Sequence, residues 1–131
     1  MRTQYKPMVI FSVERHDLSY GVNVRNKLQV ESEMRAMGID FERVLGVYKG
    51  NEETSYIVTD MDKLPIIVGM AKEHNQESIL LRDNENKCVL AFFNGEKSMS
   101  IGKMTQVSVD EALLSDCYTY SYSLKQYFIC K

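Results

Sequence analysis

The chain is poor in cysteine and histidine, the residues from which zinc sites and disulfide frameworks are built. Its cysteines, Cys88, Cys117 and Cys130, are odd in number and form no Cys-x-x-Cys pair, which argues against both kinds of site. Reduced thiols of this kind are typical of a cytosolic protein. The two histidines, His16 and His74, lie far apart, and no Asp or Glu spacing suggests a metal site. The sequence therefore predicts neither a bound metal nor a cofactor.

Long apolar runs and a strong excess of one charge are also missing. No run approaches the ~18 apolar residues of a membrane span, and residues 1–7 lack the apolar segment of a secretory signal. The net charge is -2, with both signs mixed along the chain. A surface that follows nucleic-acid phosphates needs clustered Lys and Arg instead. We therefore expect a cytoplasmic protein that binds neither membranes nor nucleic acid.

Common catalytic signatures are missing as well. The sequence has no Gly-x-Ser-x-Gly nucleophile motif, no cysteine-protease signature and no glycine-rich phosphate loop. Hydride transfer and phosphoryl transfer are therefore poorly supported. The polar chemistry that remains consists of carboxylates and tyrosines.

The composition that is present, 44% hydrophobic and 26% charged residues, is that of an ordinary globular protein. The length predicts a single domain over residues 1–131. Apolar alternation and turn residues predict strands at residues 8–13, 40–48, 53–59, 77–82, 87–93 and 98–103. With two helices between them, the order is β-α-β-β-α-β-β plus a β-rich C-terminal tail. This pattern predicts an α+β fold with a ferredoxin-like β-α-β-β-α-β core, in which a mainly antiparallel sheet carries both helices on one face.

The two helices are predicted from apolar spacing and from their ends. The helix over residues 63–75 has the i, i+3, i+4, i+7 stripe of a core-facing helix. The helix over residues 24–37 follows Asn23, a good N-cap residue. Within it, Lys27, Glu31 and Arg35 have the i, i+4 spacing of a ladder of ion pairs.

The C-terminal tail carries tyrosines at every second position: Tyr118, Tyr120 and Tyr122. Side chains with a period of two share one face of a strand. A tyrosine stripe of this kind can pack on the domain, cover a second copy of the chain, or simply close one side of the sheet.

A predicted hairpin over residues 46–58 concentrates the remaining chemistry. Gly50-Asn51 favours a tight turn, and pairing of the strands would bring Tyr48 and Glu53 to neighbouring positions. A carboxylate beside an aromatic ring makes a site for an organic cation, because the ring face is electron-rich. The alternative is an ordinary hairpin whose polar residues face solvent.

Several short motifs follow one another along the chain. They are the first apolar strand, Val22-Asn23 at the first helix, Gly46-Val47-Tyr48, the acidic pair Glu52-Glu53, and Gln76-Glu77 before an apolar strand. In this order the motifs resemble those of the small phage-encoded S-adenosylmethionine lyases, formerly called S-adenosylmethionine hydrolases. The resemblance covers roughly residues 8–94.

This resemblance implies a cytoplasmic phage anti-restriction enzyme that destroys S-adenosylmethionine, and a homotrimer with active sites at subunit interfaces. Residue by residue it implies that Glu53 is the essential carboxylate, Tyr48 the active-site tyrosine and Glu77 a second acid. Gln76, Asn23 and Ser55 would be further substrate contacts. The implied reaction is attack of the substrate's own carboxylate on its γ-carbon, which gives homoserine lactone and 5′-methylthioadenosine.

Three other outcomes stay open from the sequence. Glu53 could activate a water and hydrolyse the same substrate. A protein of the same fold could bind and sequester a small nucleotide-type ligand without catalysis. The tyrosine-rich tail over residues 117–131 could instead be the contact surface of a structural or regulatory protein.

Overall fold

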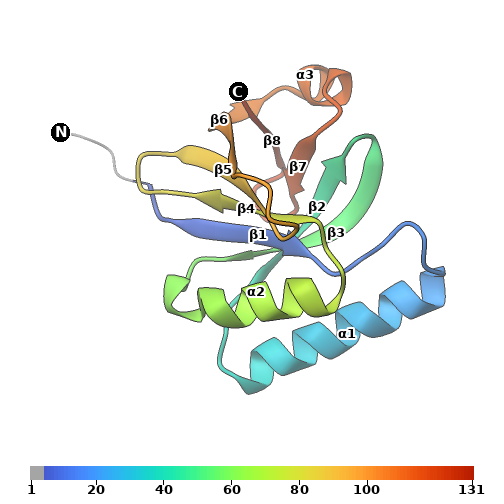
Figure 1. Cartoon of the computed structure of the whole chain (residues 1–131). Coiled ribbons are helices and arrows are strands. Elements are labelled where there is room, and N and C mark those ends of the chain that lie inside the picture. Colours follow the sequence, from blue (N-terminus) through green and yellow to red (C-terminus); the bar gives the residue numbers. More distant parts are fainter. Residues whose placement is uncertain (1–4) are drawn as a thin grey trace.

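The structure is a computed structural model, and it describes residues 5–131. Eight antiparallel strands form a closed barrel in the order β1-β3-β2-β7-β8-β6-β5-β4 (Figure 1). The strands are β1 (Met8–Ser12), β2 (Glu42–Tyr48), β3 (Asn51–Val58), β4 (Ser78–Arg82), β5 (Lys87–Phe92), β6 (Met99–Val107), β7 (Tyr118–Ser121) and β8 (Gln126–Cys130). The helices are α1 (Tyr20–Ala36), η1 (Met61–Lys63), α2 (Leu64–Glu73) and α3 (Val109–Leu114), of which η1 is a single 3-10 turn.

The predicted open, ferredoxin-like α+β sheet is wrong, because the sheet closes on itself. The order of elements from β1 to β5 agrees with the sequence prediction. The difference lies in the tail, where β7 pairs with β2 from Val44↔Ser121 to Val47↔Tyr118. β8 then pairs with β6, so that the last two strands join the two edges that an open sheet would have left free.

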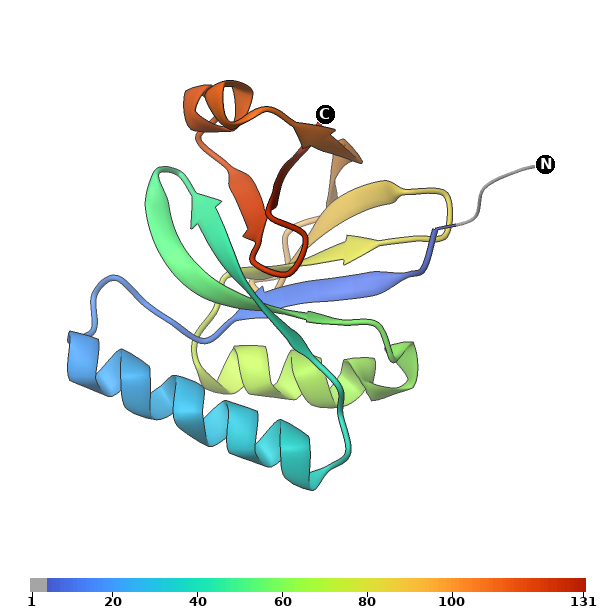
Figure 2. The same ribbon diagram turned by 180° about the vertical axis from the view of Figure 1, so that it is seen from behind.

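The outer face of the barrel wall packs into the hydrophobic core, and its inner face borders a cavity. Alternate residues of β1 and β3, such as Phe11 and Tyr56, point outward into the main hydrophobic core. Both helices supply that core, with Val30 and Met34 from α1 and Ile67 from α2. Figure 2 shows α1 and α2 lying side by side against the outside of the barrel. On β1 and β3, the residues that alternate with these outward-pointing positions therefore face the barrel interior.

The start of α1 differs from the prediction by one turn. The N-cap is Ser19, whose hydroxyl accepts a hydrogen bond from the Val22 N–H at 3.2 Å. Asn23 lies inside the helix, so the N-cap role predicted for it is wrong. Its side chain is then free to contact the loop that precedes the helix.

The tail tyrosines cluster with one another on the β7–β8 hairpin. The ring centroids of Tyr120 and Tyr127 are 4.7 Å apart, and Tyr118 lies 5.8 Å from Tyr127. Because β7 and β8 complete the barrel, Tyr118 and Tyr120 lie on a strand that closes the sheet, and Tyr122 lies in the turn after β7.

Closure also depends on a glycine in β6. Gly102 has φ +92°, and a Cβ at this position would lie 2.5 Å from the Lys131 backbone carbon. The two-way backbone hydrogen bonds between Lys103 and Lys131, both 3.0 Å, form beside it. Only glycine lets the C-terminal strand approach this closely.

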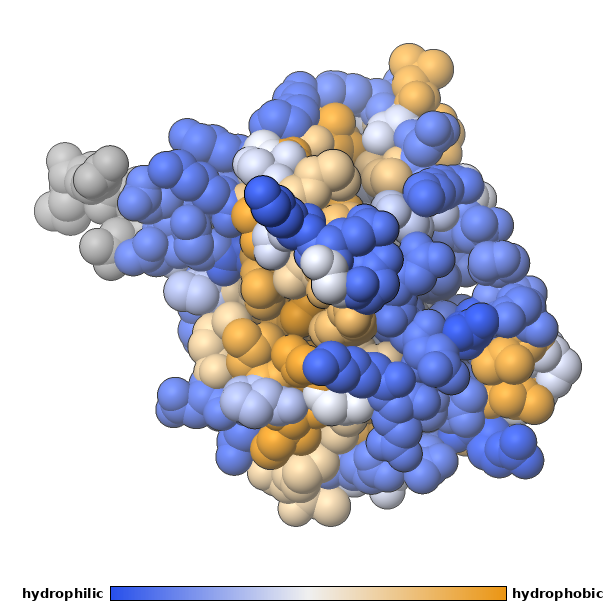
Figure 3. Space-filling view, in the orientation of Figure 1, coloured by the Kyte–Doolittle hydropathy of each residue, from blue (hydrophilic) through white to orange (hydrophobic). Residues whose placement is uncertain are grey.

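Within residues 5–131, no helix is long and apolar enough to cross a membrane. Figure 3 shows a band of hydrophobic residues on the face seen in Figure 1, with hydrophilic residues on both sides.

Candidate active site

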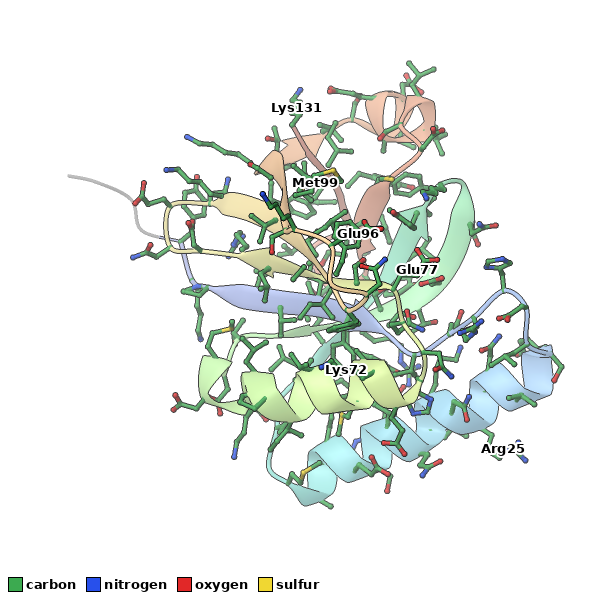
Figure 4. All side chains as sticks on the ribbon, viewed as in Figure 1. Arg25, Lys72, Glu77, Glu96, Met99 and Lys131 are labelled. Atoms are coloured by element: carbon green, nitrogen blue, oxygen red, sulfur yellow. The ribbon has the colours of Figure 1, made fainter. Side chains whose placement is uncertain are left out.

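The interior of the barrel is a cavity of about 770 Å³. Its volume falls within the ~300–1,000 Å³ of small-molecule sites in proteins. Apolar side chains from four strands form its inner wall: Leu80, Leu90, Ile101, Met104 and Phe128. Polar residues lie on the β1–α1 loop, the β2–β3 hairpin and the α2–β4 connection, and these three segments meet at one edge of the cavity. Figure 4 shows Glu77 on this side of the barrel, close to the hairpin.

The hairpin turn lies one residue earlier than predicted. Lys49 and Gly50 have φ of +52° and +80°, and Tyr48 pairs with Asn51 around them. Two consecutive residues with positive φ are typical of the two-residue type I′ turn. This register places Gly46 opposite Glu53, so Tyr48 and Glu53 share one face as diagonal neighbours. Both residues line the cavity.

Gly46 lies beside Glu53 at a position that has no room for a side chain. A Cβ at this position would lie 2.6 Å from the Ser55 hydroxyl oxygen. Ser55 is buried and also lines the cavity. The resemblance implied a substrate contact for Ser55, and its place on the inner wall is compatible with that role.

Glu53 is half-buried, and its carboxyl pKa is raised. Burial is the main cause, and the negative charges of Glu14 and Glu77 add to it. The Ser12 hydroxyl and His16 act in the opposite direction. No ion pair within residues 5–131 involves Glu53. The site therefore holds a partly desolvated carboxylate whose charge is not already neutralised.

Gln76 and Glu77 lie together at the edge of the cavity but differ in their contacts. Glu77 is exposed and lines the opening. The Gln76 side-chain amide donates a 2.9 Å hydrogen bond to the Glu14 carbonyl oxygen. Gln76 thus ties the α2–β4 connection to the β1–α1 loop.

Asn23 is the one predicted site residue that does not line the cavity. Its side chain makes two hydrogen bonds to the backbone of Arg15: it accepts from the Arg15 N–H at 3.0 Å and donates to the Arg15 carbonyl at 2.8 Å. A bidentate clamp of this kind fixes the loop backbone. Asn23 therefore contacts the β1–α1 loop from outside the cavity.

Glu14 and His16 also line the cavity, and neither was predicted as a site residue. A usable signal was present, because a polar segment that directly follows a buried strand and precedes a helix lies at a sheet end, where sites commonly form.

Metal chemistry finds no support in the arrangement of donors. Among residues 5–131, no group of three or more His, Cys, Asp or Glu side chains is placed to hold a metal ion. The polar groups at the cavity edge are instead suited to contact an organic cation, with apolar surface available for the rest of the ligand.

A family model described as the S-Adenosylmethionine lyase family matches residues 9–131, which is most of the chain. No curated protein matches the sequence closely enough to count as a relative.

Proposed function

The chain belongs to the S-adenosylmethionine lyase family, and we propose that its barrel cavity is the place where S-adenosylmethionine is cleaved. The observation that carries this assignment is the unneutralised, half-buried Glu53 carboxylate at the edge of a cavity of ligand size. The substrate carries a positive sulfonium, and a desolvated carboxylate attracts such a cation more strongly than an exposed one does.

The proposed reaction needs no reagent besides the substrate. One oxygen of the substrate carboxylate attacks the γ-carbon, the bond from the γ-carbon to sulfur breaks, and its electron pair remains on sulfur. The products are homoserine lactone and neutral 5′-methylthioadenosine, and no proton has to be transferred. The protein must hold the amino-acid chain folded back on itself. Such intramolecular positioning can contribute about 7–11 kcal/mol to lowering the barrier.

Glu53 and Tyr48 are proposed to act as the catalytic pair by selecting this folded conformation. Attraction to the cation that is equal in ground state and transition state would not accelerate the reaction. Their contribution must instead come from a fixed geometry that suits the charge distribution of the transition state. Neither residue is assigned as a base.

The remaining predicted residues receive different roles in this proposal. Glu77, exposed at the opening, is proposed to contact the positively charged α-amino group of the substrate. Ser55 contributes a hydroxyl on the inner wall. Gln76 and Asn23 are proposed to act through the loop that they hold, because their side chains already bond to the backbone of Glu14 and Arg15.

Product identification tests this mechanism directly. Purified protein incubated with S-adenosylmethionine, without added metal, should yield 5′-methylthioadenosine and homoserine lactone. In water enriched in ¹⁸O, the lactone should form without label. Label on the γ-hydroxyl of homoserine would instead show hydrolysis by an activated water. Substrate recovered intact at high protein concentration would identify a binding protein and refute the proposal.

We further propose that the protein is a phage anti-restriction enzyme that works in the host cytoplasm as a homotrimer. Removal of S-adenosylmethionine would deprive methylation-dependent defences of their methyl donor. Expression in a bacterial host should lower its S-adenosylmethionine level and its restriction of unmodified phage. Light scattering should give three times the mass of one chain. A monomer would refute the homotrimer and leave the proposal for the cavity within one barrel to be judged by the product assay.

A further inference from the structure

Lys27 joins α1 to the edge of the cavity. Its ammonium nitrogen lies 2.5 Å from a carboxylate oxygen of Glu14 and 3.4 Å from the Thr54 hydroxyl. The ion pair is largely shielded from water, since the Lys27 and Glu14 side chains are 21% and 16% exposed. The predicted Lys27–Glu31 rung of the helix ladder is absent, because Lys27 pairs with the loop and Glu31 pairs with Arg35 and Arg43.

The loop that carries Glu14 is fixed on every side. The Glu14 N–H donates to the Ser12 hydroxyl at 3.0 Å, and the Glu14 carbonyl accepts from Gln76 at 2.9 Å. The next residue, Arg15, is clamped by Asn23 and donates through its guanidinium to the Asn75 carbonyl at 3.0 Å. None of these hydrogen bonds involves the Glu14 carboxylate, and Lys27 supplies that contact.

Glu14 matters because it borders the same cavity as Glu53. Its negative charge contributes to the raised pKa of Glu53. The other titratable or charged groups that line the cavity are Arg15, His16 and Asp17 on the β1–α1 loop, Tyr48 and Lys49 on the hairpin, Glu77 on the α2–β4 connection, Cys117 and Tyr118 before and at β7, and Cys130 on β8. Of these, His16 lowers and Glu77 raises the pKa of Glu53.

We propose that Lys27 is a positioning residue of the site: it holds the Glu14 carboxylate in place and neutralises it, so that Glu53 remains the half-buried negative charge offered to a cationic ligand. The proposal rests on the function proposed above for Glu53. Lys27 itself acts through Glu14 and does not touch the substrate.

An NMR titration of the free protein tests this inference without any need for turnover. Glutamate side chains labelled with ¹³C report each carboxyl, and loss of one signal in Glu53→Gln assigns Glu53. In Lys27→Met, which preserves the apolar stem, the titration midpoint of Glu53 should rise by about one pKa unit. It should fall in Glu14→Gln, and the Lys27→Met/Glu14→Gln double variant should return near the wild-type value, because it removes both charges of the pair. An unchanged midpoint in Lys27→Met would overturn the proposal.

The pH profile of kcat/KM gives the second readout. The acid limb should move to higher pH in Lys27→Met and return in Lys27→Arg, which restores the charge. Arg25→Met is the matched control, because Figure 4 shows Arg25 on α1 pointing away from the barrel; it should leave the limb unchanged. Inactive wild-type protein would refute the proposed function while the NMR titration still decided the role of Lys27. An active Lys27→Met variant with a wild-type profile and midpoint would refute only the role of Lys27.

Discussion

Two carboxylates on opposite sides of the same barrel wall show how the environment decides what a buried charge is for. Glu31 of α1 lies outside the wall and is 2% exposed. It accepts hydrogen bonds from Arg43 at 2.6 Å and from the Tyr56 hydroxyl at 2.7 Å, and it pairs with Arg35 at 3.3 Å. Glu53 lies at the inner side, within the cavity lining and without an ion pair in residues 5–131.

The pKa values of the two groups move in opposite directions for this reason. Burial alone would raise the pKa of Glu31, but the hydrogen bonds from Tyr56 and Arg43 and the charge of Arg35 hold it below the usual value. Burial raises the pKa of Glu53, and the neighbouring carboxylates reinforce the effect. A carboxylate with built-in cationic partners stabilises the fold, whereas one without them remains available to a ligand's cation.

The largest effect should come from Glu53→Gln. The variant keeps the size of the side chain and removes its charge, so turnover of S-adenosylmethionine should fall by at least ~100-fold. Glu52→Gln is the matched control, because this exposed neighbour points to the other side of the strand. Full activity of Glu53→Gln in a product assay would remove Glu53 from the site.

Glu31→Gln should instead destabilise the protein. It weakens charged hydrogen bonds to Arg43 and Tyr56, which predicts a loss of about 2–3 kcal/mol in the free energy of unfolding by urea denaturation. Glu73→Gln, at an exposed position of α2, should change stability by less than about 0.5 kcal/mol. Turnover by Glu31→Gln at temperatures where it is folded should match wild type. A selective loss of turnover would break the division between the two sides of the wall.

Tyr56 beside Glu31 and Tyr48 beside Glu53 should differ in the same way, the first affecting stability and the second affecting turnover. Tyr56→Phe removes the hydroxyl that donates to Glu31 and should cost about 1–2 kcal/mol of stability with little change in turnover. Tyr48→Phe should leave stability within about 0.5 kcal/mol of wild type and lower turnover. Equal stability losses in both variants would mean that Tyr48 is as structural as Tyr56.

The smallest effect, and the sharpest in sign, is the pH dependence of stability. The pKa of Glu53 is higher in the folded state, so Glu53 lowers stability as pH rises through that pKa, and Glu53→Gln should gain on wild type over the same range. The pKa of Glu31 is lower in the folded state, so its contribution is present at neutral pH and is lost as pH falls through that pKa. The deficit of Glu31→Gln should therefore shrink in acid. Denaturation curves between about pH 3 and 7 measure both slopes, and slopes of the same sign would contradict the comparison.

The local elements could be predicted from the sequence because their signals are local. The apolar stripe of α2 and the alternation in β2 and β3 depend on neighbours within a few residues, and the structure has these elements close to the predicted ranges. The start of α1 was predicted one turn too late from Asn23, because Asn and Ser can both cap a helix and the structure uses Ser19.

The contacts of the candidate site likewise divide into local ones, which the sequence predicts, and long-range ones, which it does not. Tyr48 and Glu53 are five residues apart on one hairpin, so their shared face followed from strand pairing. The contacts of Gln76 with Glu14 and of Lys27 with Glu14 span distant parts of the chain. No spacing rule relates such residues, and the ladder rule gave Lys27 the wrong partner.

By itself, the sequence determined which segments are strands and helices and which hairpin carries an acid beside a tyrosine, because propensity and alternation act over a few residues. The tertiary structure alone decided that β7 and β8 bridge β2 and β6 and enclose a cavity. Alternating side chains read the same in an open sheet and in a barrel, and only long-range pairing distinguishes the two. That closure encloses the cavity that Glu53 lines, whereas Glu31 meets Arg35 and Arg43 on the outer side of the wall through contacts of α1 and β2.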